Sequence, residues 1–293
     1  MAKIIDAKKL NTVIDELIKS KEIKTDKKVI IIAATNDEAA KRYGNTKSKA
    51  LAKININSEV VTFPENITQK QLQKYIIKEV NNNDDVFGCI IQLPLYKHLD
   101  PDIIVNTVHP FKDIDCLTYY RQGSLYTVNN KQKPITTCTA QGVELIISEH
   151  IGRNLAGKNV VIVGRGPLVA DPLAKSLELK NATVTKVHTK TDALTMIGHL
   201  CKADIIISCV GNDMTHYINP QIVKDDAFII GVGFRYIDGK QIQDFNVQEF
   251  IDDENFIGKV TSNTNATGLA TIASFKLNAI TLLENQCLRK GEK

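Results

Sequence analysis

The segment GKNVVIVGRGPLVADPLAKSLELK, residues 157–180, joins a buried strand to a helix through a glycine turn. A strand is expected at 159–163, where apolar β-branched residues fill 160–163, and a helix is expected at about 167–179, with Pro167 at its beginning. Glycine at 164 and 166 permits a tight turn and the close approach of a phosphate to the helix N-terminus. The segment predicts a dinucleotide-binding loop. A plain strand-to-helix turn stays open as the alternative, because the third small residue, Ala170, arrives one position late.

The next strand bears on which dinucleotide is favoured. A strand rich in β-branched residues is expected at 182–187, and its end, VHTKT, offers no acidic residue to the ribose hydroxyls of NAD. Threonine, lysine and arginine side chains in these two turns suit a phosphorylated ribose instead, so NADP is favoured over NAD. The predicted cofactor contacts are Gly164, Arg165, Gly166, Thr189 and Lys190.

Strand and helix patterns alternate on both sides of this unit. Further strands are expected at 28–35, 59–64, 87–95, 204–210 and 227–232, with helices at 37–54, 68–80, 140–151, 192–200 and 268–288. Such alternation implies parallel strands joined by crossover helices. We predict an α/β protein of two domains with the substrate in the cleft between them. An α/β catalytic domain is expected at 1–140, completed by a C-terminal helix at 268–293, and a Rossmann-type NAD(P)-binding domain with a mostly parallel sheet at 141–267.

Composition narrows the class of protein. The 293 residues are 43% hydrophobic and 24% charged, which is typical of soluble globular proteins, and no apolar run approaches the ~20 residues that span a bilayer. The net charge of +4 is spread over both signs, so neither nucleic acid nor membrane is an expected partner. MAKIIDAKKL enters a helix-like pattern at once, without a secretory or transit signal, which predicts a cytoplasmic location. The six cysteines stand singly, so reduced thiols and no metal site are expected.

A second segment, RYGNTKSKALAKI at 42–54, admits two interpretations. Its lysines at 47, 49 and 53 fit an ordinary solvated helix face. Tyr43, however, precedes Lys47 by four residues and so shares its helical face, and a phenol beside an amine can form part of an active site. The residues of this segment alone leave both interpretations open.

Several short motifs in a fixed order resemble the methylenetetrahydrofolate dehydrogenase/cyclohydrolase family. They are Tyr43 with Lys47, IIQLPL at 90–95, KDID at 112–115, CTAQG at 138–142 and the GRG loop at 164–166. The resemblance covers essentially the whole chain. It implies an enzyme of one-carbon metabolism, supplying units used in purine biosynthesis, that acts on tetrahydrofolate derivatives as a homodimer. The implied reactions are NADP-dependent oxidation of 5,10-methylenetetrahydrofolate and hydrolysis of the methenyl product to 10-formyltetrahydrofolate. The alternatives are a cyclohydrolase with weak or no dehydrogenase activity, and a non-catalytic folate- or nucleotide-binding paralogue.

The resemblance also implies roles for four residues. Lys47 matches the family's catalytic lysine, and Tyr43 matches the tyrosine that packs against and orients the folate. Gln92 matches the glutamine that hydrogen-bonds the lysine, and Asp115 matches the aspartate that holds the aminopyrimidine edge of the pterin. These residue types suit the chemistry, because a desolvated lysine can transfer protons near neutral pH and a carboxylate can accept two parallel N–H bonds. Hydride transfer itself depends mainly on positioning.

The chain departs from the family pattern at several positions. They are Ala40 for serine, Cys116 for glycine, Ala140 for proline, Gly166 for serine, Ala170 for glycine and Gly231 for aspartate. The largest change replaces the family's PGGVGPMT with TNATGLAT at 264–271. That loop borders folate and nicotinamide in the family, so these departures bear on the dehydrogenase step more than on the lysine centre.

Overall fold

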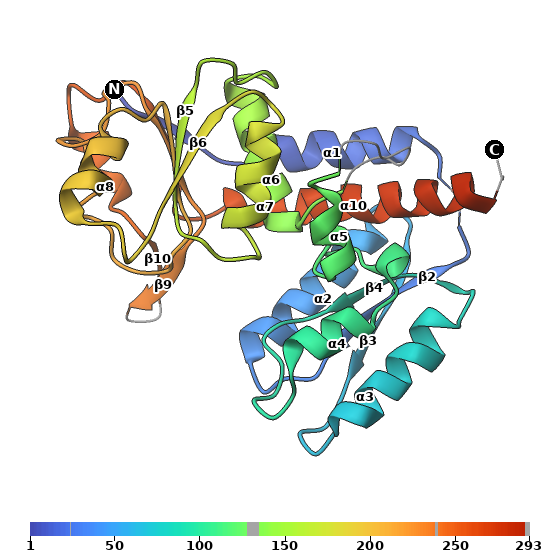
Figure 1. The fold of residues 1–293 in the computed structure, drawn as a ribbon. Helices are drawn as coiled ribbons and strands as arrows, with labels where there is room; N and C mark the ends of the chain where they lie inside the picture. Colours follow the sequence, from blue (N-terminus) through green and yellow to red (C-terminus); the bar gives the residue numbers. More distant parts are fainter. Residues whose placement is uncertain (24, 128–134, 238–239, 291–293) are drawn as a thin grey trace. The chain divides into compact units, whose positions relative to one another are not determined.

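The computed structural model describes residues 1–23, 25–127, 135–237 and 240–290, and the chain forms two compact units. Unit 1 comprises Met1–Thr12 and Thr139–Thr271, and unit 2 comprises Val13–Cys138 and Ile272–Lys293. Each unit has parallel strands and helices, which confirms the predicted two-domain α/β class (Figure 1). The assignment of a catalytic domain to residues 1–140 and 268–293, and of an NAD(P)-binding domain to residues 141–267, stays a prediction. Residues 291–293 lie outside the described part of the chain. By packing, residues 1–12 belong to unit 1.

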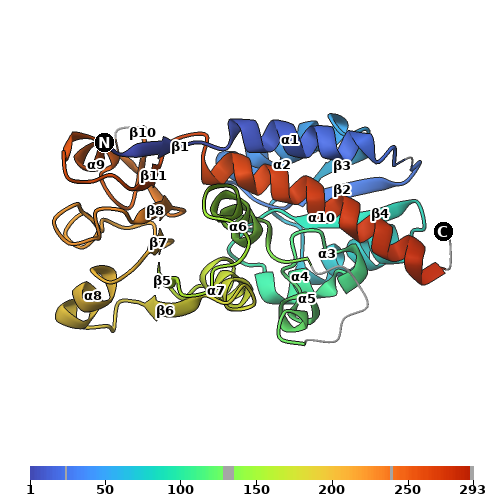
Figure 2. The ribbon, with the colours of Figure 1, turned by 90° about the horizontal axis from the view of Figure 1, so that it is seen from above.

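Unit 1 is built on a six-stranded parallel sheet. Its strand order is β1 (Lys3–Ile5), β11 (Lys259–Thr261), β8 (Phe228–Gly231), β7 (Ile205–Ser208), β5 (Asn159–Val163) and β6 (Thr183–Val187). The helices of this unit are α6 (Cys138–His150), α7 (Ala170–Glu178), α8 (Ala193–Leu200) and α9 (Val247–Asp252). Figures 1 and 2 show α6 and α7 on one face of the sheet and α8 on the other. Strands covered on both faces read as continuous apolar runs, which is why every residue of β7 and β8 is buried. An antiparallel hairpin, β9 (Phe234–Ile237) and β10 (Lys240–Gln243), follows β8.

Unit 2 has a three-stranded parallel sheet in the order β3 (Asn57–Thr62), β2 (Lys28–Ala33) and β4 (Val86–Ile91). Its helices are α1 (Lys8–Ser20), α2 (Glu38–Ala52), α3 (Gln69–Tyr75) continued by the π-helical turn η1 (Ile76–Asn81), α4 (Pro101–Thr107), the 3-10 turn η2 (Pro110–Lys112), α5 (Tyr119–Ser124) and α10 (Thr267–Lys290). Alternate residues of β2 face opposite sides. Ile30 and Ile32 join the apolar cluster under α3 and α4, whereas Ile31 approaches Gly44 of α2.

Local sequence explains where several helices begin. Asp37 caps α2 by accepting a hydrogen bond from the Ala40 backbone N–H at 2.8 Å. Thr68 and Gln71 form a reciprocal capping box at the start of α3. Each cap satisfies backbone N–H groups that the first turn of a helix leaves without partners. These caps lie within the predicted helices 37–54 and 68–80.

Three details of the chain differ from the sequence-based expectation. The N-terminus does not enter a helix at once, because residues 3–5 first pair with β11 in the large sheet. Pro167 lies in a turn, and α7 begins only at Ala170, so the glycine loop is longer than predicted. The hairpin β9–β10 was not expected from the sequence.

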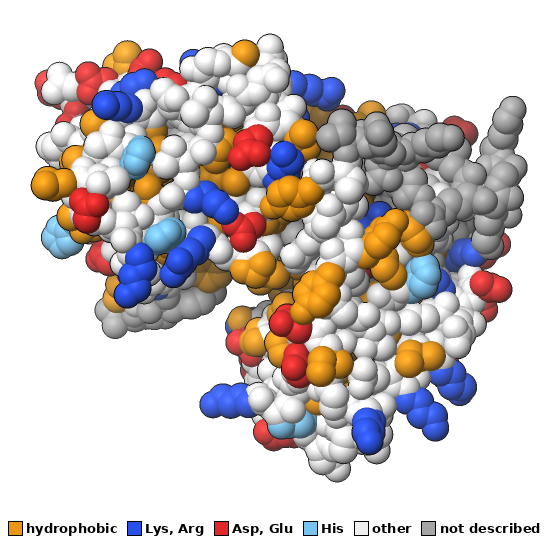
Figure 3. All heavy atoms as spheres, viewed as in Figure 1, with side chains coloured by type: hydrophobic (Ala, Val, Ile, Leu, Met, Phe, Trp, Pro, Cys, Tyr) orange, Lys and Arg blue, Asp and Glu red, His pale blue; other side chains and the backbone are white. Residues whose placement is uncertain are grey.

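Two further features concern the charges on the surface and the length and polarity of the helices. On the face shown in Figure 3, basic side chains are interspersed with acidic and hydrophobic ones. No helix in the described part of the chain is long and apolar enough to cross a membrane.

Candidate active site

Helix α2 brings a lysine into the interior of unit 2. A Cβ placed on Gly44 would still lie 3.5 Å from Ile31 Cγ2, so α2 packs closely on β2. One turn later on the helix, Lys47 is only 4% exposed, although lysine is almost never fully buried without a partner. Lys49 and Lys53 are exposed. The segment 42–54 therefore has a solvated face and a separate buried amine.

The partner of the buried amine is Asp115. Lys47 Nζ lies 2.6 Å from Asp115 Oδ2, and the two side chains are 5% and 12% exposed. The amine also lies 5.3 Å from the ring centroid of Tyr43 and 5.5 Å from that of Phe275 on α10. Burial, reinforced by the negative charge of Asp115, raises the pKa of the Tyr43 phenol, so this hydroxyl stays protonated and available as a donor. The structure thus brings together Tyr43, Lys47 and Asp115.

A buried polar network holds the second oxygen of Asp115. Cys138 Sγ lies 3.2 Å from Asp115 Oδ1, and burial followed by the charge of Asp115 raises the pKa of this thiol well above its usual value. Asn278 of α10 donates to the Ile114 and Thr136 carbonyls at 3.0 and 2.8 Å, and so fixes the backbone on both sides of the site. Sequence reasoning did not assign roles to Cys138, Asn278 or Phe275. Cys138 stood within a quoted motif, but nothing in the final helix marked which of its residues turn inward.

Gln92 stands apart from the predicted lysine contact. Its backbone N–H donates to the Ile32 carbonyl at 2.8 Å, directly after the β2–β4 pairing. Its side-chain Nε2 donates to the Leu93 carbonyl at 3.2 Å, and its Oε1 is buried without a hydrogen-bond partner. The predicted hydrogen bond between Gln92 and Lys47 is therefore absent from this structure, because the amine has a carboxylate partner instead. An unpaired buried amide oxygen is the kind of group that a ligand engages.

The predicted cofactor loop lies at the carboxyl ends of β5 and β6. Gly164 has φ of +136°, and a Cβ there would come 3.1 Å from Cys209 Sγ, so the turn requires glycine. The Gly164 N–H donates to the Val187 carbonyl at 2.8 Å, and Val163 pairs with Val187. Arg165 therefore follows the end of β5 by as many residues as Thr189 follows the end of the neighbouring strand β6. The predicted contacts Arg165, Gly166, Thr189 and Lys190 are all exposed there.

The segment 264–271 lies at the carboxyl ends of β8 and β11 within unit 1. Thr267 Oγ1 donates to the Gly231 carbonyl at 3.0 Å, and Thr261 Oγ1 accepts from the Gly231 N–H at 2.9 Å. A Cβ at position 231 would come 2.2 Å from Gln243 Oε1. The side chain of Gln243 therefore fills the space beside Gly231, which explains physically why glycine is accommodated where the family pattern has aspartate.

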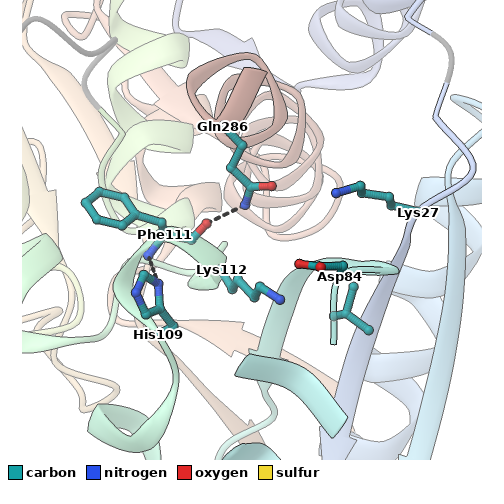
Figure 4. Close-up of a pocket in the computed structure, with 7 residues that line it drawn as sticks. Lys27, Asp84, His109, Phe111, Lys112 and Gln286 are labelled. Atoms are coloured by element: carbon teal, nitrogen blue, oxygen red, sulfur yellow. Dashed lines mark hydrogen bonds between the residues drawn. The ribbon is translucent and has the colours of Figure 1, made fainter. Parts of the chain in front are cut away.

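A different pocket of unit 2 lies at the amino end of β4, around Val86. Gln286 of α10 donates there to the Phe87 carbonyl of β4 at 2.7 Å and to the Phe111 carbonyl of η2 at 2.6 Å. Figure 4 shows the contact with Phe111. A six-residue strand spans roughly 20 Å. Gln92 follows the other end of β4, so this pocket is separate from the lysine site.

No group of three or more His, Cys, Asp or Glu side chains in the described ranges is placed to hold a metal ion. The lysine site brings together the amine of Lys47, the carboxylate of Asp115, the phenol of Tyr43 and the thiol of Cys138. Of these, the buried amine–carboxylate pair is suited to proton transfer, and the carboxylate is suited to bind an amino-substituted heterocycle.

Comparisons with known proteins agree with this geometry. Residues 3–115 match the model of the tetrahydrofolate dehydrogenase/cyclohydrolase catalytic domain, and residues 137–287 match that of its NAD(P)-binding domain. A bifunctional protein FolD of Acetivibrio thermocellus is 32% identical over 99% of both chains, and one of Caldanaerobacter subterraneus is 30% identical over 94% of this chain and 96% of its own. The crystal structure of a Campylobacter jejuni methylenetetrahydrofolate dehydrogenase/cyclohydrolase superimposes with a TM-score of 0.85 at 28% identity, covering 98% of this chain and 100% of the other. The chain therefore belongs to the tetrahydrofolate dehydrogenase/cyclohydrolase family.

Proposed function

We propose that this protein oxidises 5,10-methylenetetrahydrofolate to 5,10-methenyltetrahydrofolate with NADP and hydrolyses the product to 10-formyltetrahydrofolate. The observation that carries this proposal is the buried pair of Lys47 and Asp115 beside the Tyr43 ring. Burying an ion pair is costly, and a fold does not need one at this position for stability alone. Membership of the family supplies the substrate class, and the pair supplies the chemistry.

Asp115 holds the pterin in this proposal. A carboxylate accepts two parallel N–H bonds from an aminopyrimidine, which fixes both orientation and affinity. In the structure its oxygens contact Lys47 and Cys138. Folate binding therefore replaces these contacts with contacts to the ligand, and Tyr43, whose phenol remains protonated, packs against the folate and can donate a hydrogen bond.

Lys47 serves as the proton-transfer group for the hydrolysis. Water adds to the methenyl carbon and loses a proton, and cleavage of the bond between that carbon and N5 leaves the formyl group on N10. When the carboxylate of Asp115 turns to the pterin, Lys47 Nζ is released from its ion pair and stays beside the rings of Tyr43 and Phe275. The amine is then able to take up and return the proton. Gln92, with an unpaired buried oxygen, is the second polar group proposed to contact the substrate.

The glycine loop fits a pyridine dinucleotide. Gly164 has no side chain, and a Cβ there would approach Cys209. The bare backbone of the loop can therefore come close to a bound phosphate. Arg165, Thr189 and Lys190 are exposed at the adjacent strand ends and are proposed to bind the 2′-phosphate, which favours NADP. When bound, NADP accepts the hydride released by the methylene carbon.

Two spectrophotometric assays test the proposal. Methylene-dependent NADPH formation reports the dehydrogenase, and loss of methenyltetrahydrofolate absorbance reports the cyclohydrolase. Activity in both is expected. Activity in the second alone favours the alternative of a cyclohydrolase without a competent dehydrogenase, which the altered residues Gly231 and 264–271 would account for. Folate binding without either activity would leave a non-catalytic paralogue.

Assembly and location complete the proposal. We infer a homodimer from the family resemblance, and light scattering of the purified protein tests it. We infer a cytoplasmic location because all six cysteines are free thiols, which is the state that a reducing compartment maintains. Fractionation of cells that express the tagged protein tests this location.

A further inference from the structure

Unit 1 contains an ion pair beside the glycine loop at 164–166. Lys186 of β6 pairs through its Nζ with Oδ1 of Asp171, the acidic residue in the first turn of α7. The two side chains are 40% and 38% exposed. An exposed ion pair adds little to the stability of a fold, so stability alone does not account for this one.

Both partners adjoin hydrogen bonds that shape the loop. The Gly164 N–H donates to the carbonyl of Val187, the residue after Lys186, at 2.8 Å. The Asp171 N–H itself donates to the Gly166 carbonyl at 3.2 Å. The ion pair therefore links the strand and the helix that hold the loop from its two sides.

The carboxylate of Asp171 is unfavourable for the ligand of this loop. Under the proposed function, on which this inference rests, the bare backbone at Gly164 and Gly166 receives phosphate groups of NADP. A negative side chain on the residue that hydrogen-bonds the loop repels those phosphates, because like charges interact appreciably over several ångströms in a partly solvated site. The ammonium of Lys186 offsets this charge, so the pair as a whole is neutral.

The other basic side chains at these strand ends do not neutralise Asp171. Arg165 and Lys190 are exposed and are proposed to contact the 2′-phosphate. In the part of the chain that the structure describes, the ion-pair partner of Asp171 is Lys186 and neither of these two cations.

A second carboxylate near the loop is independent of this pair. Asp244 is buried, and its Oδ2 accepts from Ser208 Oγ at 2.5 Å and from the Val210 N–H at 3.1 Å, at the end of β7. It is close enough to the loop for its charge, after burial, to raise the pKa of the Cys209 thiol, which a Cβ on Gly164 would approach. Its charge is the same whether or not Lys186 is present, so it cancels when variants of the pair are compared.

We propose that Lys186 is a positioning residue of the nucleotide site: by pairing with Asp171 it neutralises the acidic group at the start of α7 and lets the phosphates of NADP approach the glycine loop.

Calorimetric titration of the full-length protein with NADP at low salt tests this role. Lys186→Met leaves the carboxylate of Asp171 unpaired and should weaken NADP binding at least about fivefold, the order of one charge interaction in a partly screened site. Asp171→Asn removes the carboxylate and should strengthen binding about threefold. The double variant is neutral again and should bind within about twofold of wild type, because the two changes are coupled. Lys186→Arg keeps the charge and should bind NADP as the wild-type protein does.

Lys175→Met is the matched control. Lys175 pairs with Glu178 farther along α7, at 3.5 Å, and its replacement changes the net charge of the protein by the same amount. Its NADP affinity should stay within about twofold of wild type, because its distance from the loop leaves it more strongly screened. Titration in about 1 M salt, where the Debye length is about 3 Å, separates charge from structure. The loss in Lys186→Met should shrink there, whereas a structural defect of the loop would persist.

Three results overturn the proposal while leaving the proposed function in place. They are wild-type affinity for NADP in Lys186→Met, an equal loss in Lys186→Met and Lys175→Met, and a loss in Lys186→Met that high salt does not reduce. If Lys186→Met does not fold, Asp171→Asn carries the test, and an unchanged affinity for NADP contradicts the proposal. Failure of the wild-type protein to bind NADP removes the proposed cofactor site, and this inference with it.

Discussion

At the scale of single residues, Lys47 and Asp115 show what the sequence reveals and what it hides. Each was assigned a role from a short motif, but the two are separated by 68 positions, and nothing local to either predicts that they form an ion pair. The same holds for the expected contact of Gln92 with the lysine. A side chain's partner depends on which surfaces the fold brings together, so the pairings could not be predicted from the sequence, and the residue roles stay predictions.

The buried amine gives a direct test. Lys47→Met is expected to lower cyclohydrolase turnover about a hundredfold or more, the usual contribution of a general acid–base group. Lys47→Arg keeps the charge that Asp115 requires but cannot readily release a proton, so it should be equally inactive and better folded. Cyclohydrolase turnover and the thermal unfolding midpoint are measured for both Lys47 variants. Lys49→Met and Lys53→Met change exposed lysines of the same helix. Wild-type turnover in Lys47→Arg would place the proton transfer elsewhere.

Cys116, next to Asp115, is a fully buried residue with φ of +57°. A side chain in this left-handed region costs about 1 kcal/mol relative to glycine. Cys116→Gly should therefore be more stable than Cys116→Ala by about 1 kcal/mol, because both lose the thiol but only glycine relieves the backbone. Chemical denaturation of the two variants measures the difference. Alanine as the more stable variant would show that the backbone at this position is not strained.

At the scale of secondary-structure elements, the strongly apolar strands and the amphipathic helices were predictable, and the short strands were not. β5 was predicted at its observed bounds because four consecutive apolar residues, 160–163, directly precede the glycine turn. β1 and β11 have three residues each, too few for any periodicity, and their pairing joins distant parts of the chain. The start of α7 was placed too early because proline is favoured in the first turn of a helix and here lies in the preceding turn.

Two glycines within helices, Gly142 and Gly198, provide a matched test of how closely a helix packs on its neighbours. A Cβ on Gly142 of α6 would lie 2.8 Å from the backbone of Ala270 and Thr271, whereas a Cβ on Gly198 of α8 meets nothing within 4 Å. Gly142→Ala should destabilise the protein by about 2 kcal/mol or more, because backbone cannot move aside as a side chain can. Gly198→Ala should stabilise it by up to about 1 kcal/mol through helix propensity. Thermal and urea unfolding of both variants would reveal the opposite signs, and equal effects would contradict the close contact at Gly142.

At the scale of the whole molecule, nucleotide binding should increase the free energy of unfolding. A ligand at a hundred times its Kd adds about 2.7 kcal/mol to the free energy of unfolding, so NADP should raise the thermal midpoint more than NAD does. The difference should shrink as salt rises, because exposed charges are screened over about 10 Å at 0.1 M. Arg165→Ala should remove most of the preference, since Arg165 is exposed beside the second strand end. Equal shifts by NADP and NAD in the wild-type protein would exclude a 2′-phosphate site.

The pairing of β1 with β11 also determines when the protein can fold during its synthesis. The ribosome makes β1 at residues 3–5, yet among the described residues this strand pairs only with β11 at residues 259–261. The three strands of unit 2 all lie within residues 28–91 and can associate early, but α10, which supplies Phe275 and Asn278, emerges later still. Unit 1 cannot be completed before β11 has been made, and unit 2 cannot be completed before α10 has been made. A nascent chain of this protein therefore exposes unpaired strand edges for much of its synthesis, and it depends on chaperones over that interval more than a protein with only local strand pairing would.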